Sequence, residues 1–479
     1  MTTVEQTPEA RKARPFGMRD KIGYMFGDFG NDFSFILQAF FFLAFYTKIV
    51  GIDPAHVGTL LLGARILDAF TDVGIGRFLD TRKAGPNGKF RPWVLRAAVP
   101  VAVASSLMYM TFVADWESYA ARLLYMCVTY ILWGSICYTL VNIPYGSMAS
   151  VISSNPNDRA QLSVWRSTGA ALAALVISVI VPGFVNVQDA SGNSILSGER
   201  LMWSAIIMSA FAILFYVFCY ALTTERVPQP PKKDEASFGQ MLKSLGRNKP
   251  LGGILVAALL LLVGSLLPGG LVSFLWLDYF NQGGLQSIAS LVGFAPAILL
   301  IFLVPTLAKR FGKRETGVVS LLIGGGMMVL AYFLHLQNSP WTFIVLFAVA
   351  QLMVSMFNFL IWAFITDVID YQEVNTGERD DGTIYGIYSW ARKLGQALAG
   401  GLAGWSLGWI GYQSTQGEQI VQSEGTLNGI YMLSTLVPGV LYILVALALQ
   451  FLYPLNKQAV EDNAATLIER REAKATQES

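Results

Sequence analysis

The stretch Ala64-Arg-Ile-Leu-Asp-Ala-Phe-Thr-Asp-Val-Gly-Ile-Gly76 places charged side chains inside a long apolar segment. Asp68 and Asp72 are one helical turn apart and Arg65 precedes Asp68 by three residues, so all three side chains share one face of a helix. An ionised Asp or Arg at the centre of a bilayer costs about 2.5–3.5 kcal/mol on the insertion scale. A chain retains such residues where they face water or protein. The stretch therefore indicates a helix that lines the interior of a multi-span membrane protein.

The composition of the whole chain also indicates a membrane protein. Of its 479 residues, 54% are hydrophobic and 14% are charged, and the mean hydropathy is +0.49, so the chain is far more apolar than a soluble protein. The three cysteines lie in apolar stretches and the chain has only two histidines, which argues against a disulfide framework or a histidine-based metal centre. We expect no cofactor, no nucleic-acid partner and no bound metal other than a transported cation.

Apolar runs of about 20 residues, the length that crosses a bilayer as a helix, occur at twelve places. The first run is too long for a cleaved signal peptide, so we expect the first helix to remain. Pro268-Gly-Gly270 in the seventh run predicts a kink or a broken helix. The predicted spans are 22–48, 54–80, 93–113, 120–145, 162–184, 201–222, 251–280, 291–308, 317–335, 341–366, 385–411 and 429–453.

A charged, proline-rich stretch divides the twelve runs into two sets of six. Each set has a short basic loop after its second helix, which indicates a repeated unit. Two six-helix halves around a midplane cavity form the architecture of major facilitator transporters. We therefore predict an all-α membrane protein with a cytoplasmic N-terminus at 1–21, helical halves at 22–222 and 251–455, a cytoplasmic linker at 223–250 and a cytoplasmic tail at 456–479.

The distribution of basic residues predicts the orientation of these spans. On one side of the membrane the loops contain only Lys48, Arg122 and Arg200 as cations. The loops on the other side are strongly basic, and the positive-inside rule places them and both termini in the cytoplasm. The basic loops are those that contain Arg77 to Arg96, Lys232 to Lys249 and Lys309 to Arg314.

Five motifs that follow one another along the chain resemble those of the glycoside–pentoside–hexuronide:cation symporters, the family of melibiose permease. The resemblance extends over essentially the whole membrane region, from about Lys21 to Pro454. The motifs are Lys21-Ile-Gly-Tyr-Met-Phe-Gly-Asp-Phe-Gly-Asn-Asp32, Arg65-Ile-Leu-Asp-Ala-Phe-Thr-Asp72, Gly88-Lys-Phe-Arg-Pro-Trp93, Val141-Asn-Ile-Pro-Tyr-Gly146 and Asp367-Val-Ile-Asp-Tyr-Gln-Glu373.

The resemblance implies the major facilitator fold, a location in the bacterial inner membrane and uptake of a glycoside coupled to H⁺ or Na⁺. Asn142 and Gly146 depart from the melibiose permease pattern, which favours the glucuronide and xyloside branches over a galactoside carrier. Thr71 replaces an asparagine near the cation site, which favours H⁺ over Na⁺. By position, the resemblance assigns cation binding to Asp68, Asp72 and Thr139, sugar binding to Asp32, and pocket roles to Arg166 and Lys393.

Independently of the resemblance, the chemistry of these residues supports a cation site. Two aspartates one turn apart cannot both be ionised in a dry site without a counter-charge. The pair can hold a proton, coordinate a hard cation with hydroxyl oxygens such as those of Thr71 and Thr139, or pair with Arg65. A purely structural Asp–Arg pair is the alternative interpretation. Cation binding changes the local charge by one, which is the quantity that a symporter must couple.

A second acidic pair, Asp28 and Asp32, lies on the first predicted helix. Asp32 is about 15 Å along the helix from Ile22 at 1.5 Å per residue, and a carboxylate there can accept hydrogen bonds from sugar hydroxyls. For Asp28 a substrate contact and a packing or gating ion pair are equally compatible with the sequence. We predict further substrate contacts from Asn142, Tyr145, Trp165, Arg166 and Lys393, whose cations suit a substrate carboxylate.

Charged residues at the cytoplasmic ends of the helices predict gating ion pairs. Asp80 with Arg77 or Arg82 could form a latch between the halves, and Asp367 could pair with these cations across the halves as they rock. Arg65 is the candidate partner for the acidic pair on its own helix.

These predictions converge on a monomeric symporter that imports a glycoside, such as a pentoside or glucuronide, through the lipid bilayer by alternating access with H⁺ or Na⁺. An uncoupled sugar facilitator or sensor, or a lysolipid carrier on the same fold, is the alternative. The chain contains no nucleotide-binding Gly-x-x-x-x-Gly-Lys-Ser/Thr motif. We therefore expect no enzymatic activity and no ATP-driven pumping.

Overall fold

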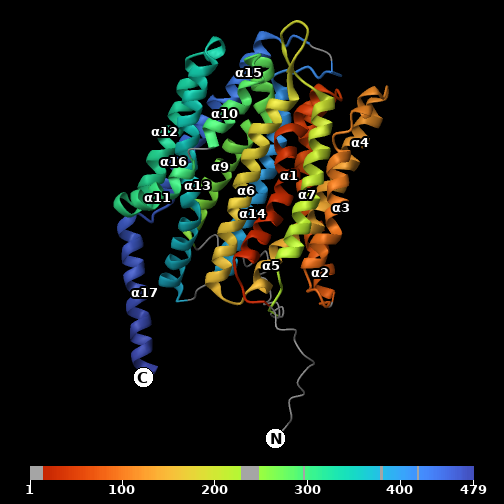
Figure 1. Cartoon of the computed structure of the whole chain (residues 1–479). Helices are drawn as coiled ribbons and strands as arrows, with labels where there is room; N and C mark the ends of the chain where they lie inside the picture. The colour runs from red at the N-terminus through yellow and green to blue at the C-terminus, as the bar shows by residue number, and fades with distance from the viewer. Residues whose placement is uncertain are drawn as a thin grey trace. The chain divides into compact units, whose positions relative to one another are not determined.

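The structure is a computed structural model that describes residues 14–82, 84–227, 248–294, 297–377, 381–417 and 420–478. Helices make up almost all of it (Figure 1). The first part of the chain forms α1 (Met18–Lys48), α2 (Pro54–Thr81), α3 (Arg91–Leu107), η1 (Thr111–Asp115), α4 (Tyr119–Ile131), η2 (Leu132–Tyr138), α5 (Thr139–Ile152), α6 (Pro156–Val185), β1 (Asn186–Gln188), β2 (Ser194–Leu196) and α7 (Gly198–Leu222).

In the second part of the chain, every regular element among the described residues is a helix. Most of the predicted linker lies outside the described residues, and the predicted tail forms a helix. The elements are α9 (Lys249–Phe274), η3 (Leu275–Tyr279), α10 (Leu285–Phe294), α11 (Ala297–Phe311), α12 (Lys313–Phe333), η4 (Leu336–Asn338), α13 (Pro340–Thr376), α14 (Asp381–Trp409), α15 (Glu424–Ser434), α16 (Leu436–Leu452) and α17 (Lys457–Glu478).

Each predicted span, where the structure describes it, falls mostly on helix. Within the described ranges, nine helices are long and apolar enough to cross a membrane. The other three predicted spans fall on α2, on α10 with α11, and on α14. The charged stripe lowers the hydropathy of α2, whereas α10 and α11 have only 10 and 15 residues each. Twelve crossings therefore remain a prediction.

Of the kink or break predicted at Pro268-Gly-Gly270, the break is wrong, because α9 continues to Phe274. The irregularity comes directly afterwards, where η3 is a π-helical turn. A second π-turn, η2, joins α4 to α5. Such wide turns are uncommon and often occur at functional sites.

The described residues divide into two compact units. The first contains residues 1–38, 66–177 and 199–231, and the second contains 39–65, 178–198 and 232–479. Helices α1, α2 and α6 contribute their two ends to different units. The ends of these three helices nearest to Lys48, Pro54 and Val185 therefore pack with the second unit, although the sequence assigns the helices to the first half.

Aromatic packing stabilises the first unit. Phe26, Phe29 and Phe33 of α1 contact Phe215 of α7, with ring centroids 5.0–5.4 Å apart. A Cβ atom at Gly27 would collide with the ring of Tyr145, so glycine is required for α5 to approach α1 this closely.

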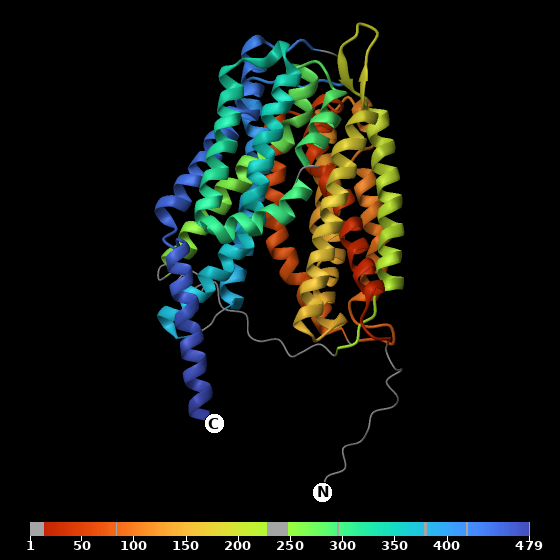
Figure 2. The same cartoon turned by 60° about the vertical axis from the view of Figure 1, so that its left-hand side comes forward.

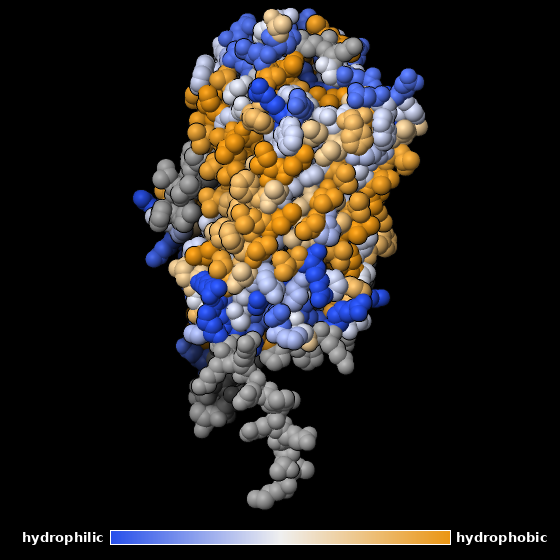
Figure 3. All heavy atoms as spheres, turned by 45° about the vertical axis from the view of Figure 1, so that its right-hand side comes forward, coloured by the Kyte–Doolittle hydropathy of each residue, from blue (hydrophilic) through white to orange (hydrophobic). Residues whose placement is uncertain are grey.

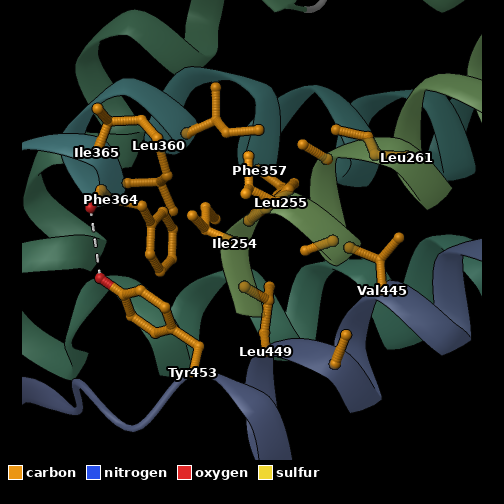
Figure 4. Close-up of a cluster of buried hydrophobic side chains, with 14 of the residues drawn as sticks. Ile254, Leu255, Leu261, Phe357, Leu360, Phe364, Ile365, Val445, Leu449 and Tyr453 are labelled. Atoms are coloured by element: carbon orange, nitrogen blue, oxygen red, sulfur yellow. Dashed lines mark hydrogen bonds between the residues drawn. The ribbon is translucent and has the colours of Figure 1, made fainter. Parts of the chain in front are cut away.

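The core of the second unit lies where α9, α13 and α16 meet (Figure 4). Ile254 of α9, Phe357 of α13 and Leu449 of α16 are each fully buried. The hydroxyl of Tyr453 donates to the carbonyl oxygen of Phe364 at 3.5 Å, so a polar group at the edge of this core has a partner.

The two β-strands form a small antiparallel hairpin between α6 and α7 (Figure 2). It is fixed to the segment that follows η3. Asn186 donates to the carbonyl oxygen of Gly283 at 3.0 Å, and the Ser194 amide donates to Asn281 Oδ1 at 2.7 Å.

The exposed side chains suit a lipid environment. On the face shown in Figure 3, hydrophobic residues cover the middle of the helices and hydrophilic residues gather toward the ends. On α7, Trp203, Ile207, Phe211 and Leu214 recur at helical spacing and are 42–50% exposed. A stripe of this kind has no polar partner and indicates a lipid-facing surface.

Candidate functional site

The acidic stripe of α2 contacts a hydroxyl from the π-turn η2. The Ser135 hydroxyl donates to Asp68 Oδ1 at 2.5 Å. Asp68 and Asp72 are both half-buried, and Thr71 donates its hydroxyl to the Asp68 carbonyl oxygen at 3.2 Å. The Asp68 carboxylate therefore lies beside a hydroxyl of a neighbouring helical segment, with Asp72 one turn further along α2, and such oxygen atoms suit a hard cation.

Thr139, the hydroxyl ligand that the resemblance predicts, lies on the same helical segment. Its side chain is buried and donates to the carbonyl oxygen of Gly134, five residues earlier, at 3.2 Å. Ser135, which sequence reasoning missed, makes the contact to Asp68. The only sequence signal for Ser135 is its position one turn before Thr139. Within the described residues, no group of three or more His, Cys, Asp or Glu side chains could hold a metal ion.

The second acidic pair forms an ion-paired cluster in the first unit. Arg166 Nε of α6 lies 3.0 Å from Asp28 Oδ1 of α1. The Asp28 side chain is 8% exposed, whereas the Arg166 side chain is 42% exposed. The guanidinium thus neutralises a buried carboxylate and keeps part of its donor surface accessible. Of the two roles left open for Asp28, this contact supports the ion pair.

Tyr145 packs against this cluster and contacts both Arg166 and Tyr24. The Arg166 guanidinium lies 5.3 Å from the Tyr145 ring centroid, a cation–π distance. The Tyr145 hydroxyl donates to the Tyr24 carbonyl oxygen at 2.7 Å, and the two rings stack at 4.7 Å. Because Tyr145 is fully buried, its ring holds Arg166 in place and presents no free face to a sugar.

The remaining predicted substrate residues are more accessible than Tyr145. Asp32 is half-buried one turn beyond Asp28, and the charges of Asp28 and Arg166 both act on it. Asn142 and Trp165 are half-buried in the same unit. Lys393 is exposed on α14 in the second unit.

The predicted gating residues have different outcomes. Arg77 is exposed and Arg65 is half-buried on α2, and the Asp80 side chain lies outside the described residues. Asp367 is buried and pairs with Lys313 Nζ at 2.5 Å. The observed partner of Asp367 therefore comes from its own unit, and pairing between the halves stays a prediction.

Long apolar helices with lipid-facing stripes, buried ion pairs and half-buried carboxylates define a multi-span membrane transporter. A family model described as MFS/sugar transport protein matches residues 23–457. The chain belongs to this family of major facilitator sugar transporters, and within it to the glycoside–cation symporters. The predicted fold class is confirmed, and so is the prediction that the protein is a transporter and no enzyme.

Two curated relatives and one solved structure illustrate the similarity. A Salmonella typhimurium protein named as a proposed 2,3-dihydroxypropane-1-sulfonate exporter is 33% identical over 446 residues, 92% of this chain and 93% of its own. A glucuronide carrier protein homolog of Escherichia coli K12 is 30% identical over 454 residues, 95% and 96% of the two chains. A bacterial homologue of human Spinster, solved inward-facing and occupied, has a TM-score of 0.61 at 14% identity and covers 91% of this chain and 95% of that chain, which supports the fold alone.

Proposed function

We propose that the protein couples sugar or glycoside uptake to H⁺ or Na⁺ in the bacterial inner membrane, with both termini in the cytoplasm. The observation that carries the proposal is the hydrogen bond from the Ser135 hydroxyl to Asp68, with Asp72 one turn away on the same helix. Carboxylate and hydroxyl oxygens suit a proton or a hard cation. Binding of either ion lowers the negative charge of the pair by one before the halves rock.

We further propose that the substrate is anionic, a uronide or a sulfonated sugar. The partly exposed guanidinium of Arg166 suits a carboxylate or sulfonate. Asp32, one turn from the ion pair, suits the hydroxyls of the same molecule. The names of the two relatives, a sulfonate exporter and a glucuronide carrier homolog, support this class of substrate.

Coupling follows from linked binding. If the cation raises substrate affinity, substrate must raise cation affinity by the same factor. Cation binding at the α2 carboxylates and substrate binding at Arg166 are then energetically coupled, although the two groups lie on different helices.

Uptake into right-side-out vesicles tests this function. Radiolabelled glucuronides, sulfonated sugars and neutral xylosides are supplied under a pH gradient or a sodium gradient, each imposed separately. We expect an anionic substrate to accumulate above its external concentration under at least one gradient. Equilibration without accumulation under both gradients would show an uncoupled facilitator, and preference for the neutral xylosides would contradict the anionic substrate.

Arg166→Gln is expected to weaken binding of the anionic substrate by about tenfold or more, because a charge-assisted contact worth about 1.4 kcal/mol or more is lost. Equilibrium binding to the purified protein measures the effect. Arg159→Gln, a change of the same charge at an exposed position on α6, is the control. Equal affinity of Arg166→Gln and the control would exclude Arg166 from the pocket.

A further inference from the structure

Ser135 differs from most of the helical hydroxyl side chains around it. Thr129 and Ser147, on either side of it in the segment from α4 to α5, donate to their own helix backbone, to the carbonyl oxygens of Tyr125 and Ile143 at 2.8 and 2.9 Å. Ser135 instead donates across to α2. It is fully buried and lies inside the π-turn η2. The wider turn changes the direction of the side chains, which explains how this hydroxyl leaves its own backbone.

From this contact we propose that Ser135 positions the Asp68 carboxylate for the coupling cation, an inference that rests on the proposed function. The Ser135 hydroxyl donates a hydrogen bond to Asp68 Oδ1, and this bond restrains the orientation of the carboxylate. A cation bound here would be coordinated by carboxylate oxygens of Asp68 and by the lone pairs of the Ser135 oxygen. Ser135 is a positioning residue, because it acts through Asp68.

Cation titrations of Ser135→Ala and Ser135→Thr test this role. In transport assays and in equilibrium binding of Na⁺ at several pH values, we expect Ser135→Ala to raise the half-saturating cation concentration about tenfold, equivalent to about 1.4 kcal/mol. The maximal rate at saturating cation should change little, and Ser135→Thr should restore affinity. Ser147→Ala, which removes a hydroxyl bonded only to its own helix, is the matched control.

The outcomes separate this inference from the proposed function. If the wild-type protein responds to neither Na⁺ nor pH, the proposed coupling fails. If the wild-type responds and Ser135→Ala has the same cation affinity, the positioning role alone is overturned. A uniform loss of rate at every cation concentration, without an affinity change, would likewise overturn it, because that is the effect of a purely structural residue.

A second, independent observation is an ion pair within the second unit. Lys48, the last residue of α1, donates through Nζ to both carboxylate oxygens of Asp278 on η3 at 2.6 and 2.7 Å. The two side chains are 12% and 16% exposed. Tyr412 donates its hydroxyl to the same carboxylate at 3.1 Å. Burial, with the charge of Asp278, holds the pKa of the Tyr412 hydroxyl well above its usual value of 10.0, so it stays a donor.

Backbone hydrogen bonds join the same two regions beside the ion pair. The amides of Thr415 and Gly417 donate to the carbonyl oxygens of Thr47 and Lys48, each at 2.9 Å. Beside the ion pair is a pocket of about 200 Å³ with a mixed polar and apolar lining, to which Asn193, Asn281 and Gln422 also contribute. The end of α1, from the first half of the sequence, is thus bound to segments of the second half by an ion pair and by hydrogen bonds.

The geometry points to Lys48–Asp278 as a latch on the extracellular side that must break each time the transporter opens outward. In a transporter of two six-helix halves, α1 belongs to one half and η3 to the other. Breaking a buried pair by removing one partner is strongly destabilising, because the remaining charge stays desolvated. Asp278→Asn should therefore favour the open state at this end.

A reporter cysteine measures this opening without any substrate. Thr47 is fully buried, and Thr47→Cys is introduced after the three native cysteines are replaced. We expect Asp278→Asn to raise modification by an impermeant thiol reagent, added outside intact cells, about fivefold or more. Exchanging the charges with Lys48→Asp and Asp278→Lys should restore slow modification.

Asp53→Asn is the matched control, because it removes the same charge from the loop after α1 while an asparagine can still accept from the Ala55 amide. It should label at the parent rate. An unchanged rate in Asp278→Asn, or equal acceleration in Asp53→Asn, would overturn the latch. This assay measures only the accessibility of residue 47. A negative result would therefore overturn the latch without affecting the proposed coupled transport, and failure of the proposed coupling would not overturn the latch.

Discussion

Asp68→Asn and Asp72→Asn are each expected to abolish uphill accumulation of substrate while the protein still reaches the membrane. An amide has nearly the shape of the carboxylate, but it can neither take up a proton at neutral pH nor supply a formal charge to a cation. The binding step can then no longer change the charge of the site by one. The gradient is no longer linked to the substrate, and only downhill movement remains.

Gradient-driven uptake in vesicles measures this effect, with the amount of protein determined in the same membranes. Asp53→Asn again provides a control for the loss of one negative charge, since this residue lies outside the candidate site. Accumulation at the wild-type level in both α2 variants would exclude the cation assignment. Loss in only one of them would limit the essential charge to that carboxylate.

Gly404→Val is expected to reduce transport to less than about a tenth of the wild-type rate. A Cβ atom at Gly404 of α14 would collide with the Pro54 carbonyl oxygen and lie 2.5 Å from the Gly58 backbone nitrogen. Because these atoms are backbone, no side-chain rotation can relieve the overlap. Forcing extra carbons into such a contact typically costs about 1–3 kcal/mol, and more where the surroundings cannot move. The variant therefore cannot close α2 against α14.

Gly63→Val provides a matched control on α2, because a Cβ atom there meets nothing within 4 Å. It introduces the same β-branched residue into a helix at an open position. The Thr47→Cys reporter should label faster in Gly404→Val and at the parent rate in Gly63→Val. Normal transport by Gly404→Val would show that this contact is not needed in the cycle.

The sequence predicted the helices well because hydropathy and length determine them. The described residues of all twelve apolar runs fall mostly on helix, and Arg65, Asp68 and Asp72 lie on α2. The π-turns η2 and η3 were not predictable, because a wide turn and an ordinary helical turn have the same local composition. Of the kink or break predicted at Pro268, the break is wrong, since α9 continues past the proline.

The site was predictable only in part. A charge inside an apolar run is energetically costly and therefore indicates a function. On this ground the sequence indicated Asp68, Asp72, Asp28 and Arg166. Their partners were harder to infer: Ser135, which donates to Asp68, lies in the π-turn η2, and the local composition does not indicate such a turn. Lys48 and Asp278 are 230 positions apart, and nothing in either local sequence indicates that they meet.

In the proposed cycle, a cation neutralises the α2 carboxylates once per turnover. Purified protein in proteoliposomes, loaded without substrate and given a labelled anionic sugar outside, tests it most directly. With an inward gradient of H⁺ or Na⁺ and no other driving force, we predict that internal substrate rises above the external concentration and that Asp68→Asn eliminates this rise. If internal substrate only equals the external concentration under both gradients, the account is contradicted.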